Sequence, residues 1–284
     1  MVRDALIAAH GWEPSAVEIV TIRTTGDAVQ DRPLAEIGGK ALWTKEIDRA
    51  LLASEIDASV HSMKDVETFR PESIALAAVL ERADVRDRII GAKSLAALPQ
   101  GAVLGTSSPR RAAQVRKLRP DLRIVMFRGN VDTRLAKVAD GEADATLLAA
   151  AGLERLGREV GHPIPVETML PAPAQGAVGI EVRADDGHAR YLLAAIDHPE
   201  THACILAERA LLAALKADCH SPVGALATID GAIMTLRAEL LSEDGAESVH
   251  AHEAGAPGDI ALSQAVARDL LARAPEAIRR LFDG

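Results

Sequence analysis

Two short stretches of the chain carry residue types that can take part in acid–base or covalent chemistry. The first, VHSMKD, ends an apolar run with Ser62, Lys64 and Asp65. The second, KADCHSPVG, holds Cys219, one of 2 cysteines in 284 residues. A carboxylate can move protons or stabilise positive charge, and a thiolate is a nucleophile or a metal ligand. The residue types alone leave these roles open.

Several interpretations of the first stretch compete. Ser62 and Lys64 alternate onto one face of a strand, which raises a Ser–Lys nucleophile, but no oxyanion hole or further motif accompanies them. Asp65 beside Lys64 is either a surface ion pair of little energetic worth or a general acid in a basic pocket. The stretch by itself does not choose between these two.

The two cysteines lie near histidines and mimic a zinc pattern. His202 and Cys204 would point about 200° apart on a helix, and the adjacent pair Cys219–His220 suits one ion poorly. We therefore expect no metal site. Cys204 lies on an apolar helix face and is interpreted as a buried hydrophobe. Cys219 stays undecided between thiol chemistry and an incidental loop position.

Basic residues gather between positions 106 and 137, where nine basic and two acidic side chains give +7 in a chain of −9. Pro109 suits the first position of a helix that follows a strand, and such a helix start binds anions. Arg110 and Arg111 oppose the helix dipole there, so we expect a bound anion to relieve the conflict. Arg128 stands before a Gly-Asn turn at the next strand end, where its fork suits a carboxylate or phosphate.

Short apolar strands alternate with helical patterns through most of the chain, which predicts α/β units with mostly parallel sheets. The expected strands are 16–22, 56–60, 73–80, 101–106, 123–127, 143–151 and 177–183, and the expected helices are 41–53, 108–118 and 131–141. Segment 81–88 is interpreted as a connection. From about residue 199 a helix, a hairpin at Asp230-Gly231, a strand over 248–254 and a closing helix indicate a small α+β domain.

Composition restricts the classes of protein. Hydrophobic residues make up 48% of the chain, which suits a globular fold, and a net charge of −9 disfavours nucleic-acid binding. No apolar run is long enough to span a membrane, and the first residues lack a signal peptide. We expect a cytoplasmic protein with reduced cysteines.

Seven motifs occur in one order: GGKALWTKE, VHSMKDV, GTSSPRR, FRGNVDTRL, LAAAGLERLG, QGAVGIE and ADCHSPVG. From about residue 16 onward the chain closely resembles the hydroxymethylbilane synthase family, also called porphobilinogen deaminases. The resemblance implies two doubly wound domains like those of periplasmic binding proteins, followed by a small C-terminal α+β domain. It places domain 1 at 1–80 and 177–196, domain 2 at 85–172 and domain 3 at 199–284.

The resemblance also implies a reaction. The family's transferases condense four porphobilinogen molecules head to tail with loss of ammonia and release hydroxymethylbilane for porphyrin and heme biosynthesis. A dipyrromethane cofactor, attached to a cysteine that matches Cys219, primes the chain. Asp65 matches the catalytic aspartate, which would stabilise the positive charge that develops on the pyrrole N–H groups. We expect a monomer that takes the small molecule porphobilinogen and contacts neither nucleic acid nor membrane.

The remaining site residues also follow from the resemblance, because pyrrole acetates and propionates make the growing chain a polycarboxylate. The expected cofactor ligands are Ser62, Lys64, Thr106, Ser108, Arg110, Arg111, Arg134 and Gln175. The expected substrate ligands are Lys40, Trp43, Arg128, Arg134 and Arg155.

The chain departs from the family pattern at its start. The usual first strand, with an Arg-x-Ser-x-Leu-Ala pattern that contributes substrate contacts, is missing, so we expect either a truncation or a miscalled start, with impaired activity. Trp43 replaces a common Phe, Ala41 and Ala174 replace common glycines, and Glu67 replaces a common proline.

Two rival hypotheses remain. One is a non-catalytic binder of carboxylated ligands, which would not need Cys219. The other is a nucleic-acid binder that uses residues 106–137, whose binding would weaken steeply with salt.

Overall fold

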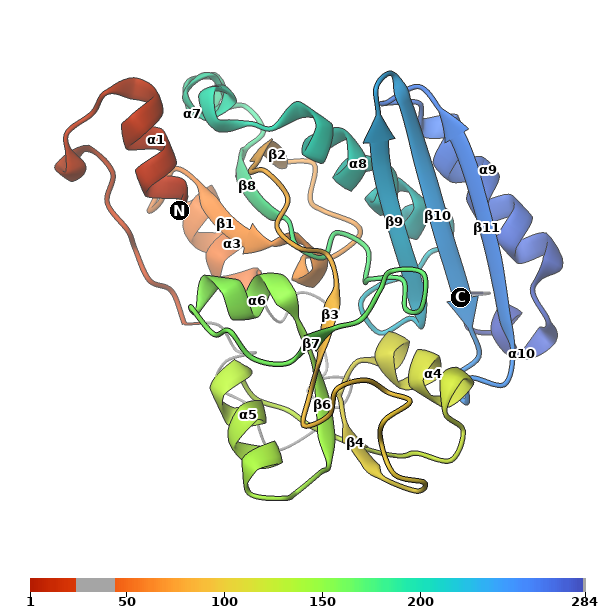
Figure 1. Cartoon of the computed structure of the whole chain (residues 1–284). Coiled ribbons are helices and arrows are strands. Elements are labelled where there is room, and N and C mark those ends of the chain that lie inside the picture. The colour runs from red at the N-terminus through yellow and green to blue at the C-terminus, as the bar shows by residue number, and fades with distance from the viewer. Residues whose placement is uncertain (24–43, 283–284) are drawn as a thin grey trace. The chain divides into compact units, whose positions relative to one another are not determined.

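The computed structural model describes residues 1–23 and 44–282 (Figure 1). These residues form two compact units. The first comprises residues 1–82 and 177–202, and the second comprises residues 83–176 and 203–284. The expected fold class, α/β with a small C-terminal α+β part, is confirmed, whereas the division into three domains stays a prediction.

A three-stranded sheet forms the centre of the first unit, with β8 (Val178–Arg183) between β1 (Ser59–Ser62) and β2 (Ile74–Val79). Both neighbours are antiparallel to β8. The expectation of a mostly parallel sheet is therefore wrong for the described strands of this unit. The reason is that β8 comes from a distant part of the chain and enters the sheet in the opposite direction.

Short helices surround this sheet. They are α1 (Val2–His10), α3 (Lys45–Leu52) and α7 (Gly187–Leu193), with single 3-10 turns η1 (Pro14–Ala16), η3 (Met63–Asp65) and η4 (Ala194–Ile196). The strand expected at 16–22 is wrong, because the chain there pairs with no described strand. Ile19 and Val20 are 66% and 52% exposed, so their apolar alternation faces no core.

The second unit contains a five-stranded sheet in the order β5–β4–β6–β3–β7. Its strands are β3 (Asp87–Ile90), β4 (Val103–Gly105), β5 (Arg123–Val125), β6 (Ala145–Ala149) and β7 (His162–Pro163). The strand β4 is parallel to β5 and β6, as expected, whereas β3 is antiparallel to β6 and β7. The sequence interpretation missed β3, because the charged segment before it resembles a surface connection.

Helices follow three of these strands: α4 (Pro109–Leu118), α5 (Val131–Ala139) and α6 (Ala150–Arg155). The first begins at Pro109 as expected, and the Ser108 side chain caps it by accepting a hydrogen bond from the Arg111 backbone N–H at 3.4 Å. Asn130 caps α5 in the same way at 2.9 Å. Each cap starts a helix directly after a strand and brings basic side chains to that end of the sheet.

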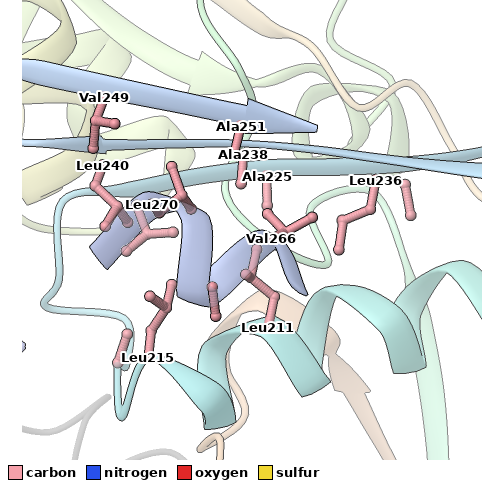
Figure 2. Close-up of a cluster of buried hydrophobic side chains, with 14 of the residues drawn as sticks. Leu211, Leu215, Ala225, Leu236, Ala238, Leu240, Val249, Ala251, Val266 and Leu270 are labelled. Atoms are coloured by element: carbon pink, nitrogen blue, oxygen red, sulfur yellow. The ribbon is translucent and has the colours of Figure 1, made fainter. Parts of the chain in front are cut away.

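The C-terminal part of the second unit is an antiparallel sheet of β9 (Val223–Asp230), β10 (Ile233–Leu241) and β11 (Ser248–Gly255). The expected hairpin is present, with Asp230 paired to Ile233 and a two-residue loop that begins at Gly231. One face of this sheet packs on α8 (Pro199–Ala214) and α9 (Ile260–Arg273), and Figure 2 shows Leu211, Val266 and Leu270 between them. The short helix α10 (Glu276–Arg279) follows.

Among the helices of the described residues, none combines the length and the apolar character that a membrane crossing requires.

Candidate active site

Asp65 lies in the 3-10 turn that follows β1 in the first unit. The turn is anchored by Met63, which is buried and whose backbone N–H donates to the carbonyl of Ala177 at 3.1 Å. Ser62 and Lys64 are half-buried, whereas Asp65 is exposed. Buried and accessible side chains therefore alternate through the turn, which leaves the Asp65 carboxylate open to a ligand.

The segment after Asp65 is fixed by Arg70. Its guanidinium donates to Asp48 of α3 at 2.7 Å and to Glu181 of β8 at 2.7 Å and 3.0 Å. It also donates to Glu67 at 3.1 Å, and Glu67 accepts a hydrogen bond from Thr44 at 2.8 Å. These bonds connect a helix, a strand and the segment after Asp65, so they restrict the path of the chain on leaving the turn.

The carboxylates of this cluster favour the charged form of Arg70. Burial alone would lower the pKa of Arg70, but the hydrogen bonds to Asp48 and Glu181 outweigh burial and raise it. Asp48, His61 and Glu181 bring three possible metal-ligand atoms within 4.8 Å of one another. However, the Arg70 guanidinium already lies against both carboxylates and supplies the positive charge that a metal ion would bring.

In the second unit, Arg110 and Arg111 converge on one carboxylate, that of Asp87 at the start of β3. Arg110 Nη2 donates to one carboxylate oxygen at 2.8 Å, and Arg111 Nη2 donates to the other at 2.7 Å. Gln175 donates to Asp87 at 2.9 Å as well. All four side chains are buried, and Asp87 is 2% exposed.

This arrangement corrects one step of the sequence argument. Two arginines in the first turn of a helix are repelled by the helix dipole unless an anion lies beside them. We expected a bound ligand to provide that anion. The chain provides it through Asp87, 23 residues before Arg110. Burial alone would raise the pKa of Asp87, but the charges of Arg110 and then Arg111 outweigh burial and hold that pKa far below its usual range. The assignment of both arginines as cofactor ligands stays a prediction.

Three further arginines expected in the site have more accessible positions. Arg128 follows β5, and its Nη1 is buried without a hydrogen-bond partner among the described residues. Arg134 of α5 is half-buried and donates through Nε to the Gly129 carbonyl at 2.9 Å. Arg155 ends α6 and is exposed. Arg128 and Arg134 lie on either side of the turn that joins β5 to α5.

Gly129 makes this turn possible. Its backbone has a φ of 110°, in the left-handed region that favours glycine. A Cβ at this position would lie 2.7 Å from the Thr133 side chain, which is too close. The absence of a side chain at Gly129 therefore allows the backbone next to Arg128 to pack closely against α5.

Thr106 and Gln175 are both buried at the edges of this region. Thr106 Oγ1 accepts a hydrogen bond from the Ser108 backbone N–H at 3.2 Å and helps to shape the loop before α4. Gln175 follows Ala174, which has a left-handed φ of 62° and donates its N–H to the buried carboxylate of Glu208. Glu208 also accepts from the Ala227 backbone N–H at 2.7 Å, so one carboxylate fixes the Gln175 loop to β9.

The two cysteines have opposite environments. Cys204 is 6% exposed inside the hydrophobic cluster of α8, α9 and the C-terminal sheet, as expected. Cys219 is exposed in the loop between α8 and β9, and both cysteines are free. The Cys219 Sγ lies 3.6 Å from Nδ1 of His220. Of the two thiols, only that of Cys219 is accessible to a large electrophile.

Lys40 and Trp43, two of the expected substrate ligands, lie outside the described residues, as does the glycine-bearing loop before them. The sequence interpretation missed Arg70, Glu181 and Asp87. The unbalanced arginines at the start of α4 were one signal for Asp87, because a buried arginine requires a carboxylate. No local signal indicated Arg70, whose partner Glu181 is 111 residues away.

The described residues combine a mixed α/β fold with an exposed loop thiol, an exposed turn carboxylate and arginines at strand ends, and arginines suit the binding of carboxylates. Two family descriptions match the chain. "Porphobilinogen deaminase, dipyromethane cofactor binding domain" matches residues 1–191, and "Porphobilinogen deaminase, C-terminal domain" matches residues 202–272. The chain belongs to the porphobilinogen deaminase family.

Relatives agree over nearly the full length. The porphobilinogen deaminase of Sphingopyxis alaskensis is 58% identical, and the alignment covers 99% of this chain and 91% of that protein. The porphobilinogen deaminase of Paracoccus denitrificans is 50% identical, with 96% and 89% covered.

Proposed function

We propose that the chain condenses four porphobilinogen molecules head to tail, releases ammonia at each step and yields hydroxymethylbilane. The observation that carries this proposal is the match to both family domains, together with an accessible Cys219 and an exposed Asp65. The product serves tetrapyrrole biosynthesis, and the enzyme is a transferase.

The residues present fit a dipyrromethane cofactor. A thioether to a protein requires a thiol that a pyrrole can reach, and Cys219 meets this condition whereas the buried Cys204 does not. When bound, the cofactor supplies the terminal pyrrole carbon to which the first substrate unit is joined. The unpartnered Nη1 of Arg128 suits one of the acetate or propionate groups of such a ligand.

Asp65 is proposed as the catalytic residue. Loss of ammonia from porphobilinogen leaves an electron-poor pyrrole, whose N–H carries developing positive charge. A carboxylate held close to that N–H stabilises the charge and can move a proton. Met63 and the Arg70 cluster fix the chain on both sides of the turn, so Asp65 is held without being paired to a described side chain.

The basic residues are proposed to bind the carboxylates of cofactor and substrate. We assign Ser62, Lys64, Thr106, Ser108, Arg110, Arg111, Arg134 and Gln175 to the cofactor, and Lys40, Trp43, Arg128, Arg134 and Arg155 to the substrate. We further propose that the enzyme acts as a monomer in the cytoplasm. Light scattering on the purified protein tests the first statement, and cell fractionation tests the second.

The direct test is the replacement Asp65→Asn, which keeps the size of the side chain and removes its charge. Turnover of porphobilinogen should fall at least ~100-fold, a typical loss for a charge-stabilising or proton-transferring group. The thermal midpoint should stay close to that of the wild type, because Asp65 is exposed. Glu72→Gln, at another exposed acid of the first unit, is the matched control and should leave turnover unchanged. Normal turnover in Asp65→Asn would contradict the assignment.

A further inference from the structure

The loop that carries Cys219 is organised around Asp218. Asp218 Oδ1 accepts a hydrogen bond from the His220 backbone N–H at 2.8 Å, and the Ser221 backbone N–H donates to the Asp218 carbonyl at 3.1 Å. The Asp218 N–H in turn donates to Ser221 Oγ at 3.2 Å. These three bonds hold residues 218–221 in a tight turn and bring the side chains of Asp218, Cys219 and His220 together.

The imidazole of His220 lies between an acid and a thiol. Its Nδ1 is 3.5 Å from Asp218 Oδ1 and 3.6 Å from Cys219 Sγ. Hydrogen bonding to Asp218, and after it to Cys219, raises the pKa of His220 to about 10. These are the two titratable groups with the largest effects on this imidazole. The ring therefore carries its positive charge more readily than a free imidazole does, and it lies 3.6 Å from the sulfur.

A cation beside a cysteine favours the thiolate, which is the nucleophilic form. We propose that His220 activates Cys219 for attachment of the dipyrromethane primer, because its ring nitrogen Nδ1 lies 3.6 Å from the sulfur that must act as the nucleophile. Asp218 acts through His220 as a positioning residue, because it orients the ring and favours its charged form. This inference rests on the function proposed above, since attachment of the primer is the step in which the sulfur reacts.

The step is balanced without an oxidant or reductant. A bond forms between Cys219 Sγ and the aminomethyl carbon of a porphobilinogen unit, and the carbon–nitrogen bond of that unit breaks. The nitrogen keeps the electron pair of the broken bond and takes the proton of the His220 imidazolium, so it leaves as ammonia. His220 ends as a neutral imidazole, and the sulfur ends as a neutral thioether.

The test uses the full-length apoprotein, produced in a host that cannot make porphobilinogen, and iodoacetamide as the probe of the thiol. The alkylation rate is followed by intact mass from about pH 5 to about pH 11. His220→Gln should lower the rate about 10-fold near pH 7, since the thiolate loses its cation. The two rates should converge above pH 10, where the wild-type imidazolium has lost its proton.

Three further variants separate this effect from misfolding. His220→Lys keeps a positive charge beside the sulfur and should restore most of the rate. His252→Gln changes an exposed histidine of β11 and should leave the rate unchanged. Cys219→Ser should abolish alkylation, because Cys204 is buried. Identical pH profiles for the wild type and His220→Gln would overturn the inference.

Incubation of the same apoproteins with porphobilinogen separates the inference from the function on which it rests. A wild type that gains two pyrrole units faster than His220→Gln supports both. Equal rates of adduct formation would overturn the role of His220 alone. A wild type that reacts readily with iodoacetamide but never gains the adduct would overturn the proposed function, and the attachment role with it.

Discussion

Arginines at two neighbouring strand ends of the same sheet differ in burial and in their carboxylate partners. Arg110 and Arg111, after β4, are 3% and 5% exposed and share the carboxylate of Asp87. Arg110 and Arg111 each keep a buried Nε without a partner, as Arg128 after β5 keeps its Nη1, but Arg128 has no carboxylate partner among the described residues. The sequence places both groups in the same kind of position, and the difference arises from whether the chain itself provides a carboxylate.

The comparison separates two uses of a buried positive charge. A guanidinium that already has a carboxylate stabilises the fold and leaves few donors for a ligand. A guanidinium without a carboxylate partner keeps an uncompensated charge in the free protein, and a ligand carboxylate can pair with it. We therefore expect changes around Asp87 to act mainly on stability, and changes at Arg128 to act mainly on substrate binding.

The largest expected effect follows Asp87→Ala. This change leaves two buried arginines without their carboxylate, and breaking a buried ion pair in this way costs about 3–5 kcal/mol of unfolding free energy. Urea unfolding followed by circular dichroism measures the loss. Asp121→Ala, at an accessible partner of Arg119, is the control and should change the midpoint far less. Equal midpoints for wild type and Asp87→Ala would contradict the account.

A smaller effect is expected for Arg128→Gln. Loss of one charged hydrogen bond to a substrate carboxylate should lower kcat/KM for porphobilinogen by about 10- to 100-fold. The unfolding midpoint should stay near that of the wild type, since the Nη1 donor has no described partner to lose. Arg111→Gln is the matched comparison and should lower the midpoint clearly. If Arg128→Gln were the less stable of the two, the proposed division of roles would be wrong.

The smallest expected effect is a pH dependence of stability. The pKa of Asp87 is lowered in the folded state, so its contribution is fully present above about pH 4, the unfolded value. That contribution is lost as the pH falls toward the much lower folded value, because the unfolded chain then binds the proton more readily. Urea midpoints measured from about pH 6 down to about pH 3 should fall more steeply for the wild type than for Asp87→Asn. Parallel curves would show that Asp87 is not held ionised by the arginines.

Local patterns predicted much of the fold. The Pro109 helix start, the Asp230 hairpin and the apolar strand at 177–183 each depend on a few adjacent residues. The strand expected at 16–22 is wrong because alternation of apolar residues does not specify a neighbouring strand. The ordered motifs indicated Asp65 and Cys219, whose accessible positions follow from a short turn and a loop.

Partners that are distant in sequence were not predictable in this way. Asp87 meets Arg110 across 23 residues, and Glu181 meets Arg70 across 111. Neither pairing leaves a periodic pattern, because each depends on the order of strands in a sheet. The antiparallel entry of β8 between β1 and β2 brings Glu181 to Arg70. This strand order cannot be deduced from the residues adjacent to either side chain.

The most direct measurement is the mass of the peptides from a protease digest of the purified enzyme, made in a host with a normal porphobilinogen supply. The account predicts that the peptide containing Cys219 carries two pyrrole units and that the peptide containing Cys204 is unmodified. In Cys219→Ser neither peptide should carry the addition. An unmodified Cys219 in an enzyme that still forms hydroxymethylbilane, or an adduct on Cys204, would contradict the account.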